Sequence, residues 1–190
     1  MMDEVNQSFE DWCVYKHAST NHFYDKKLGL PYKFHLTMAE LAGLEFKRLL
    51  EIDPPKRFVN FDIWKDIVKP AIWGHDVIED ARASYNDVLK LSNKHVAEIV
   101  RAVSNDSRGR TRAERMPDYI YEEIATTPFA TFVKLCDRIA NIRYSWMMQS
   151  GMFNTYKEEH THFKEMLDRD PILQPMWALL DSLLLPKLTL

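Results

Sequence analysis

Glycine is scarce in this chain, with 5 among 190 residues, and long stretches contain no turn-forming residue. A protein built from many short strands would need more turns, so helices are favoured. Hydrophobic residues make up 46% of the chain and charged residues 28%, which is ordinary for a globular protein. The length suits one domain with a sizeable core. We therefore expect an all-α, single-domain helical bundle over residues 1–190.

Four other features are missing, and each argues against a class of protein. Two cysteines, Cys13 and Cys136, do not make a disulfide framework for a chain of this size. The net charge of −3 and the lack of long basic runs give no support for nucleic acid or an anionic membrane as partner. No apolar run approaches the roughly 20 residues that span a bilayer. The first residues, MMDEVNQSFEDW, are acidic where a secretory signal is basic and then apolar. We expect a cytoplasmic protein.

The helices are predicted from apolar periodicity and capping residues. Pro31 is suited to begin a helix, and Pro70 is expected to kink or restart one, because proline disrupts a straight helix interior. Ser84 with Asp87 resembles a capping box, and Asn93 is a good N-cap. The expected helices cover about 8–18, 31–51, two stretches within 60–80, a short one after Ser84, and 94–104, 112–125, 128–148, 155–168 and 171–184. Polar loops are expected at 19–30 and around NDSRGRTR.

The stretch GHDVIED concentrates acidic groups beside a histidine. On a helix, the spacing of four places His75 over Glu79 and Asp76 over Asp80. Three carboxylates so close together repel one another unless a cation neutralises them. For a D-x-x-E-D string taken alone, a solvated acidic helix end is the favoured explanation.

Two further residues belong to the same question. Asp137 lies in the apolar stretch FVKLCDRIANI, where a buried carboxylate needs a cation or a salt bridge with Lys134 or Arg138. His35, in LPYKFH, is on its own most simply a core histidine. Together, two histidines and two aspartates supply four nitrogen and oxygen ligands without a thiolate. Such a set suits Mn²⁺, Fe²⁺ or Zn²⁺.

Four segments, taken in order, resemble the HD-domain phosphohydrolases. LPYKFHL resembles P-Y-x-x-H-P, and WGHDVIED resembles L-H-D-x-x-E-D. VSNDSRGRTRAER and VKLCDRIANI resemble the later V-T-D-D and K-L-A-D motifs. More narrowly, the pattern is similar to the hydrolase domain of RelA/SpoT proteins and to the small alarmone hydrolases, including metazoan SpoT homologues. The resemblance runs from about His17 to Arg143, and four motifs in order are far more specific than one.

The resemblance implies a function and a role for individual residues. It implies hydrolysis of a small nucleotide, the 3′-pyrophosphate of ppGpp or pppGpp, with a divalent metal that is best taken as Mn²⁺. The implied metal ligands are His35, His75, Asp76 and Asp137. Glu79 and Asp80 match the catalytic acidic pair, and Lys26, Lys27, Lys134, Arg138 and Asn141 are expected to contact the substrate. Arg108 and Arg112, in the arginine-rich loop, are further cations that could neutralise phosphate charge.

The chain departs from the family pattern where the substrate is held. The family has basic residues just before P-Y-x-x-H, whereas this loop reads STNHFYDKKLGL, so Lys26, Lys27 or His22 would have to replace them. Leu36 and the pair Trp73-Gly74 also differ from the pattern. Two alternatives follow: hydrolysis of another nucleotide, such as NADPH, an adenosine pyrophosphate or a deoxynucleoside monophosphate, or nucleotide binding without turnover. A plain helical scaffold would leave all these polar placements unexplained.

Overall fold

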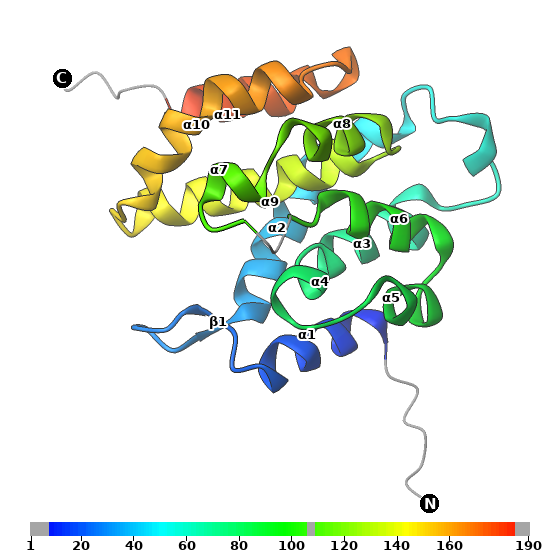
Figure 1. The fold of residues 1–190 in the computed structure, drawn as a ribbon. Coiled ribbons are helices and arrows are strands. Elements are labelled where there is room, and N and C mark those ends of the chain that lie inside the picture. The colour runs from blue at the N-terminus through cyan, green and yellow to red at the C-terminus, as the bar shows by residue number, and fades with distance from the viewer. Residues whose placement is uncertain (1–7, 106–108, 185–190) are drawn as a thin grey trace, which may run out of the picture.

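Helices α2 and α9 pack against each other along the middle of the molecule and carry much of the later site (Figure 1). The computed structural model describes residues 8–105 and 109–184. The α-helices are α1 (Phe9–Ser19), α2 (Tyr32–Phe46), α3 (Lys69–Gly74), α4 (Val77–Asp80), α5 (Tyr85–Leu91), α6 (Lys94–Val103), α7 (Arg112–Arg115), α8 (Asp118–Thr126), α9 (Ala130–Met147), α10 (Met152–Leu167) and α11 (Gln174–Leu184). Shorter helical turns cover Lys47–Glu51, Lys56–Phe58 and Pro171–Leu173, and a π-helix covers Ile63–Val68.

One cluster of buried side chains joins these helices. Leu36 on α2, Ile72 on α3, Val100 on α6 and Ile139 on α9 are all completely buried within it. Helices α3 and α6 pack beside the central pair, while α8, α10 and α11 cover α9. Burial of this apolar surface is the main force that holds the segments together. The all-α fold expected from the sequence is confirmed.

Several predicted helix boundaries are confirmed by their caps. The Ser8 side chain accepts a hydrogen bond from the Asp11 backbone at the start of α1. Ser84 and Asp87 form the predicted capping box of α5, and Asn93 caps α6. Pro70 lies in the first turn of α3, directly after the π-helix, as expected of a residue that cannot continue a straight helix.

Three predicted segments are corrected. The loop at 19–30 contains an antiparallel hairpin of β1 (Phe23–Asp25) and β2 (Leu30–Pro31). The single helix expected over 112–125 is wrong, because Pro117 separates α7 from α8. His75 and Glu79 do not share one helix, since α3 ends at Gly74 and α4 begins at Val77. Arg108, part of the predicted arginine-rich loop, lies outside the described residues.

Within residues 8–105 and 109–184, no helix has both the length and the apolar character needed to cross a membrane.

Candidate functional site

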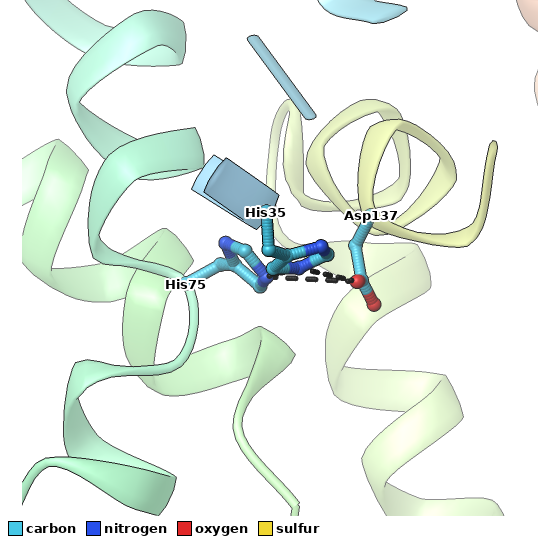
Figure 2. Close-up of side chains that lie close together, drawn as sticks. All are labelled: His35, His75 and Asp137. Atoms are coloured by element: carbon cyan, nitrogen blue, oxygen red, sulfur yellow. Dashed lines mark hydrogen bonds and ion pairs between the residues drawn. The ribbon is translucent and has the colours of Figure 1, made fainter. Parts of the chain in front are cut away.

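Two histidines and an aspartate from three separate segments meet in the interior. His35 lies on α2, His75 directly after α3 and Asp137 on α9, and their side chains point toward one another (Figure 2). His35 Nε2 is 3.2 Å from His75 Nε2 and 3.2 Å from Asp137 Oδ1. His75 Nε2 lies 3.6 Å from the same oxygen. One possible ligand atom from each residue therefore lies within 4.8 Å of the others, close enough to share a metal ion.

Asp76 joins this cluster. Its Oδ2 is 3.0 Å from His75 Nε2 and 3.9 Å from His35 Nε2. The same oxygen accepts a hydrogen bond from the hydroxyl of Tyr32. The structure therefore brings together all four residues that the sequence singled out as metal ligands.

The local backbone orients His75. Its Nδ1 lies 2.6 Å from the carbonyl oxygen of Ile72, which only accepts hydrogen bonds, so Nδ1 carries a proton and donates it. Nε2 then faces the cluster, the arrangement usual for a metal-binding histidine. Gly74 allows this position, because a Cβ there would lie 3.0 Å from Val100 and 3.1 Å from Phe9. The end of α3 can thus press closely between α1 and α6.

The charges of the cluster depend on one another. Burial opposes the charged form of His75, but the carboxylates of Asp76 and Asp137 outweigh burial and raise its pKa well above the usual value. Burial likewise opposes ionisation of both aspartates, but the two histidines lower the pKa of Asp137 and His75 lowers that of Asp76. Two carboxylates thus surround two buried imidazole nitrogens, and no cysteine belongs to the set. This donor set fits a divalent cation, which would supply the positive charge otherwise carried by a proton.

Glu79 and Asp80 lie at the edge of this cluster with different partners. Glu79 accepts hydrogen bonds from the Nδ2 and backbone N–H groups of Asn105, at 2.8 and 3.3 Å. Burial and the neighbouring Asp76 raise the pKa of Glu79 above its ordinary value. The same two causes raise the pKa of Asp80 to about 7, in the range expected of a group that accepts protons near neutral pH.

His17 and His22 extend the site toward α1, and sequence reasoning did not identify His17. Their Nδ1 atoms are 3.0 Å apart, and His22 Nε2 lies 3.8 Å from Asp80 Oδ2. Both rings stack on Tyr32, at centroid distances of 4.1 and 4.2 Å. Burial lowers the pKa of both histidines, that of His17 to about 3, so one neutral ring donates to the other.

The expected substrate residues on α9 also serve the cluster. The amide nitrogen of Asn141 donates a hydrogen bond to Asp137, while its oxygen accepts one from the Tyr24 hydroxyl at 2.9 Å. The ammonium group of Lys134 donates to the Val103 carbonyl at 3.2 Å and lies 3.8 Å from Asp137 Oδ2. These contacts hold the Asp137 carboxylate in place.

A polar cavity of about 140 Å³ opens beside the cluster. Its walls include Asp76, Glu79, Asp80, Asn105, Arg112, Met116, Lys134, Asp137, Arg138, Asn141 and Tyr156. Lys26 and Lys27 are not among these lining residues, since they lie exposed in the turn of the hairpin. Arg112, which the sequence offered as a group that could neutralise phosphate charge, lines the cavity, and so do Asn105 and Tyr156, which were not among the expected site residues. Of these, only Asn105 and Arg112 fall within a segment that carried the family resemblance.

Comparison with known proteins finds one similarity in part of the sequence and one in the fold. No family model matches the chain. A stretch of 69 residues is 36% identical to the guanosine-3′,5′-bis(diphosphate) 3′-pyrophosphohydrolase of Drosophila melanogaster. That stretch covers 36% of this chain and 38% of the relative. The sequence match confirms the resemblance expected from the four segments.

A solved structure shares the whole fold. It is described as a metazoan orthologue of SpoT that hydrolyses ppGpp and plays a role in starvation responses. The TM-score is 0.62, with 21% sequence identity and 96% of each chain covered. The chain therefore has the all-α fold of that SpoT orthologue, and the HD-type fold expected from the sequence is confirmed.

Proposed function

We propose that this chain, as one domain, is a metal-dependent phosphohydrolase that releases pyrophosphate from the 3′ position of guanosine alarmones, ppGpp and pppGpp. The observation that carries the proposal is the convergence of His35, His75, Asp76 and Asp137 beside a cavity that also contains Glu79 and Asp80. The relative of similar sequence is named as a guanosine-3′,5′-bis(diphosphate) 3′-pyrophosphohydrolase, and the structural neighbour is described as hydrolysing ppGpp.

The metal in this proposal is Mn²⁺. Two imidazole nitrogens and two carboxylates form a set of nitrogen and oxygen donors, which Fe²⁺ and Zn²⁺ also accept. His35 and His75 would bind through Nε2, and Asp76 and Asp137 through one carboxylate oxygen each. A divalent cation in such a site lowers the pKa of a water molecule from 15.7 to about 7 and polarises a phosphoryl oxygen.

The chain's own groups complete the reaction. In our proposal, Glu79 accepts the proton of the attacking water while Asp80 orients that water, and general base help of this kind is typically worth about 10²–10⁴-fold. Asn105 fixes the Glu79 carboxylate through two hydrogen bonds. Lys134 and Arg138, which line the same cavity, neutralise phosphate charge.

We also propose a cytoplasmic location, in keeping with two buried, unpaired thiols.

The first test measures metal binding and turnover in the same variants. We expect His75→Ala and Asp137→Asn to abolish both calorimetric Mn²⁺ binding and pyrophosphate release from ppGpp. His162→Ala is the matched control, since this histidine side chain is 56% exposed and its ion-pair partner is Asp118 on α8. Retention of tight Mn²⁺ binding by His75→Ala would remove the proposed metal centre.

The substrate is tested with a panel that includes NADPH, an adenosine pyrophosphate and a deoxynucleoside monophosphate. Turnover of one of these in preference to ppGpp would keep the metal chemistry and change the substrate. Nucleotide binding without any product, at saturating Mn²⁺, would instead identify a binding module.

A further inference from the structure

The lining of the cavity beside the metal-site cluster contains four carboxylates and three basic side chains. Asp76, Glu79, Asp80 and Asp137 come from the segment around α4 and from α9. The basic residues Arg112, Lys134 and Arg138 come from α7 and α9. The carboxylates suit a cation and a water molecule, while the three basic side chains suit an anion.

Two of the basic residues are held as a pair by one carboxylate. Arg112 donates from Nε and Nη2 to the two oxygens of Glu159, at 2.7 and 3.1 Å. Arg138 donates from Nη1 to Glu159 Oε2 at 2.9 Å. One glutamate on α10 therefore fixes two guanidinium groups from different elements, and the group keeps an excess positive charge.

Aromatic rings fix the same guanidinium groups from the side. Arg112 and Arg138 lie 5.5 and 4.9 Å from the ring centroid of Tyr156, which also lines the cavity. Arg138 lies 4.2 Å from the ring of Phe163 and is 8% exposed. Each guanidinium has five N–H groups, and the contacts with Glu159 use two of them in Arg112 and one in Arg138. Fixed forks of this kind bind phosphate oxygens well.

The size of the cavity limits what it can hold. Its volume of about 140 Å³ is well below the roughly 300–1,000 Å³ of pockets that enclose a whole drug-sized ligand. A phosphate group fits this space better than a nucleoside does. The hairpin lysines Lys26 and Lys27 do not line it. Among residues 8–105 and 109–184, the basic side chains that line this space are those of Arg112 on α7 and of Lys134 and Arg138 on α9.

We propose that Arg112 and Arg138 form a phosphate subsite for the second phosphate of the substrate, the one beyond the phosphorus that is attacked. The inference rests on the proposed function and deepens it, because such a subsite selects a pyrophosphate ester over a phosphate monoester. Lys134 lies next to Asp137 and faces the attacked phosphate, while the arginine pair receives its neighbour.

Binding of inorganic pyrophosphate tests the subsite without requiring turnover. Calorimetry is run with the full chain, in matched buffer with and without Mn²⁺. We expect Arg112→Ala to weaken pyrophosphate binding by about tenfold to a hundredfold, the range for hydrogen bonds to charged groups. Arg138→Lys, which keeps the charge and loses the fork, should weaken it in the same direction. Arg112 has a side chain that is 53% exposed, so its removal should leave the fold intact.

Arg143→Ala is the matched control, because Arg143 also makes a two-pronged contact, with Glu45, and is not among the lining residues. Its pyrophosphate affinity should stay within about twofold of the parent chain. In turnover, Arg112→Ala should lower kcat/KM for a 3′-pyrophosphate nucleotide at least tenfold more than for a 3′-monophosphate nucleotide.

Equal pyrophosphate affinity in the parent chain, Arg112→Ala and Arg138→Lys would overturn the subsite. Failure of the proposed function gives a different result, namely pyrophosphate binding that depends on Arg112 in a protein without hydrolytic turnover.

Discussion

The ionisation of Glu79 links one residue of the cavity to a testable pH dependence. Burial and Asp76 raise the pKa of Glu79, while Lys134 and the hydrogen bonds from Asn105 lower it. Asn105→Ala removes the side-chain bond to the charged form, so the pKa of Glu79 should rise. A base must be deprotonated to act, so the acidic limb of the kcat/KM profile should move to higher pH.

The profile itself distinguishes this cause from general damage. At a pH above the shifted limb, Asn105→Ala should recover most of the parent rate. Asn154→Ala, on α10 away from the cavity lining, should leave the profile unchanged. A loss of equal size at every pH would show that Asn105 does not act through the ionisation of Glu79.

Among single residues, the sequence identified those with unusual chemistry. It did not identify the residues that hold them in place. His75 and Asp76 form a visible pair, and Asp137 interrupts an apolar run, so each gives a signal on its own. The roles of Asn105 and His17 depend on which segments pack together, and that information is not local. An asparagine in a loop and a histidine on a surface-like helix have common explanations, so nothing in the residue type alone marked them.

Among the elements, α2 and α3 approach each other closely at Gly43. A Cβ at this position would lie 2.8 Å from Ile72 Cδ1 and 3.0 Å from Trp64 Cη2. Overpacking typically costs about 1–3 kcal/mol, against a gain of about 1 kcal/mol in helix propensity. Gly43→Ala should therefore lower the free energy of unfolding by about 1 kcal/mol, seen as a fall in Tm of about 2–4 °C.

Gly151→Ala is the control for this change. Nothing lies within 4 Å of a Cβ at Gly151, and its backbone is already helical. Its free energy of unfolding should change by less than about 0.5 kcal/mol. A Gly43→Ala protein as stable as the parent would mean that Trp64 and Ile72 move aside without cost.

The boundaries of a helix can be predicted where a capping residue or a proline gives a local signal. A strand that depends on pairing with a distant segment gives no such signal. The capping box at Ser84 and the N-cap at Asn93 were both recognisable from a few residues. Pro117 is an equally local signal for the break between α7 and α8, although one continuous helix was expected there. The hairpin of β1 and β2 has only 3 and 2 residues in its strands, too short for a period of two to be visible.

For the whole molecule, the site is the place where segments far apart in the sequence come into contact. His35, His75 and Asp137 lie on α2, directly after α3 and on α9, which pack against one another in the core. The sequence predicted that these segments converge only through the resemblance to a known family. Apolar periodicity alone gives helices, and not which of them become neighbours.

This convergence couples metal binding to global stability, because the unfolded chain has no such set of ligands. A ligand that binds only the folded state, present at 100 times its Kd, adds about 2.7 kcal/mol to the free energy of unfolding. For a domain of this size, Mn²⁺ should therefore raise Tm by about 5–10 °C. A chelator should reverse the rise, which differential scanning calorimetry measures directly.

His75→Ala should unfold at the same temperature with and without Mn²⁺, whereas His162→Ala should keep the full increment in Tm. If the increment persisted in His75→Ala, the ion would be binding elsewhere, and the four converging side chains would need another explanation.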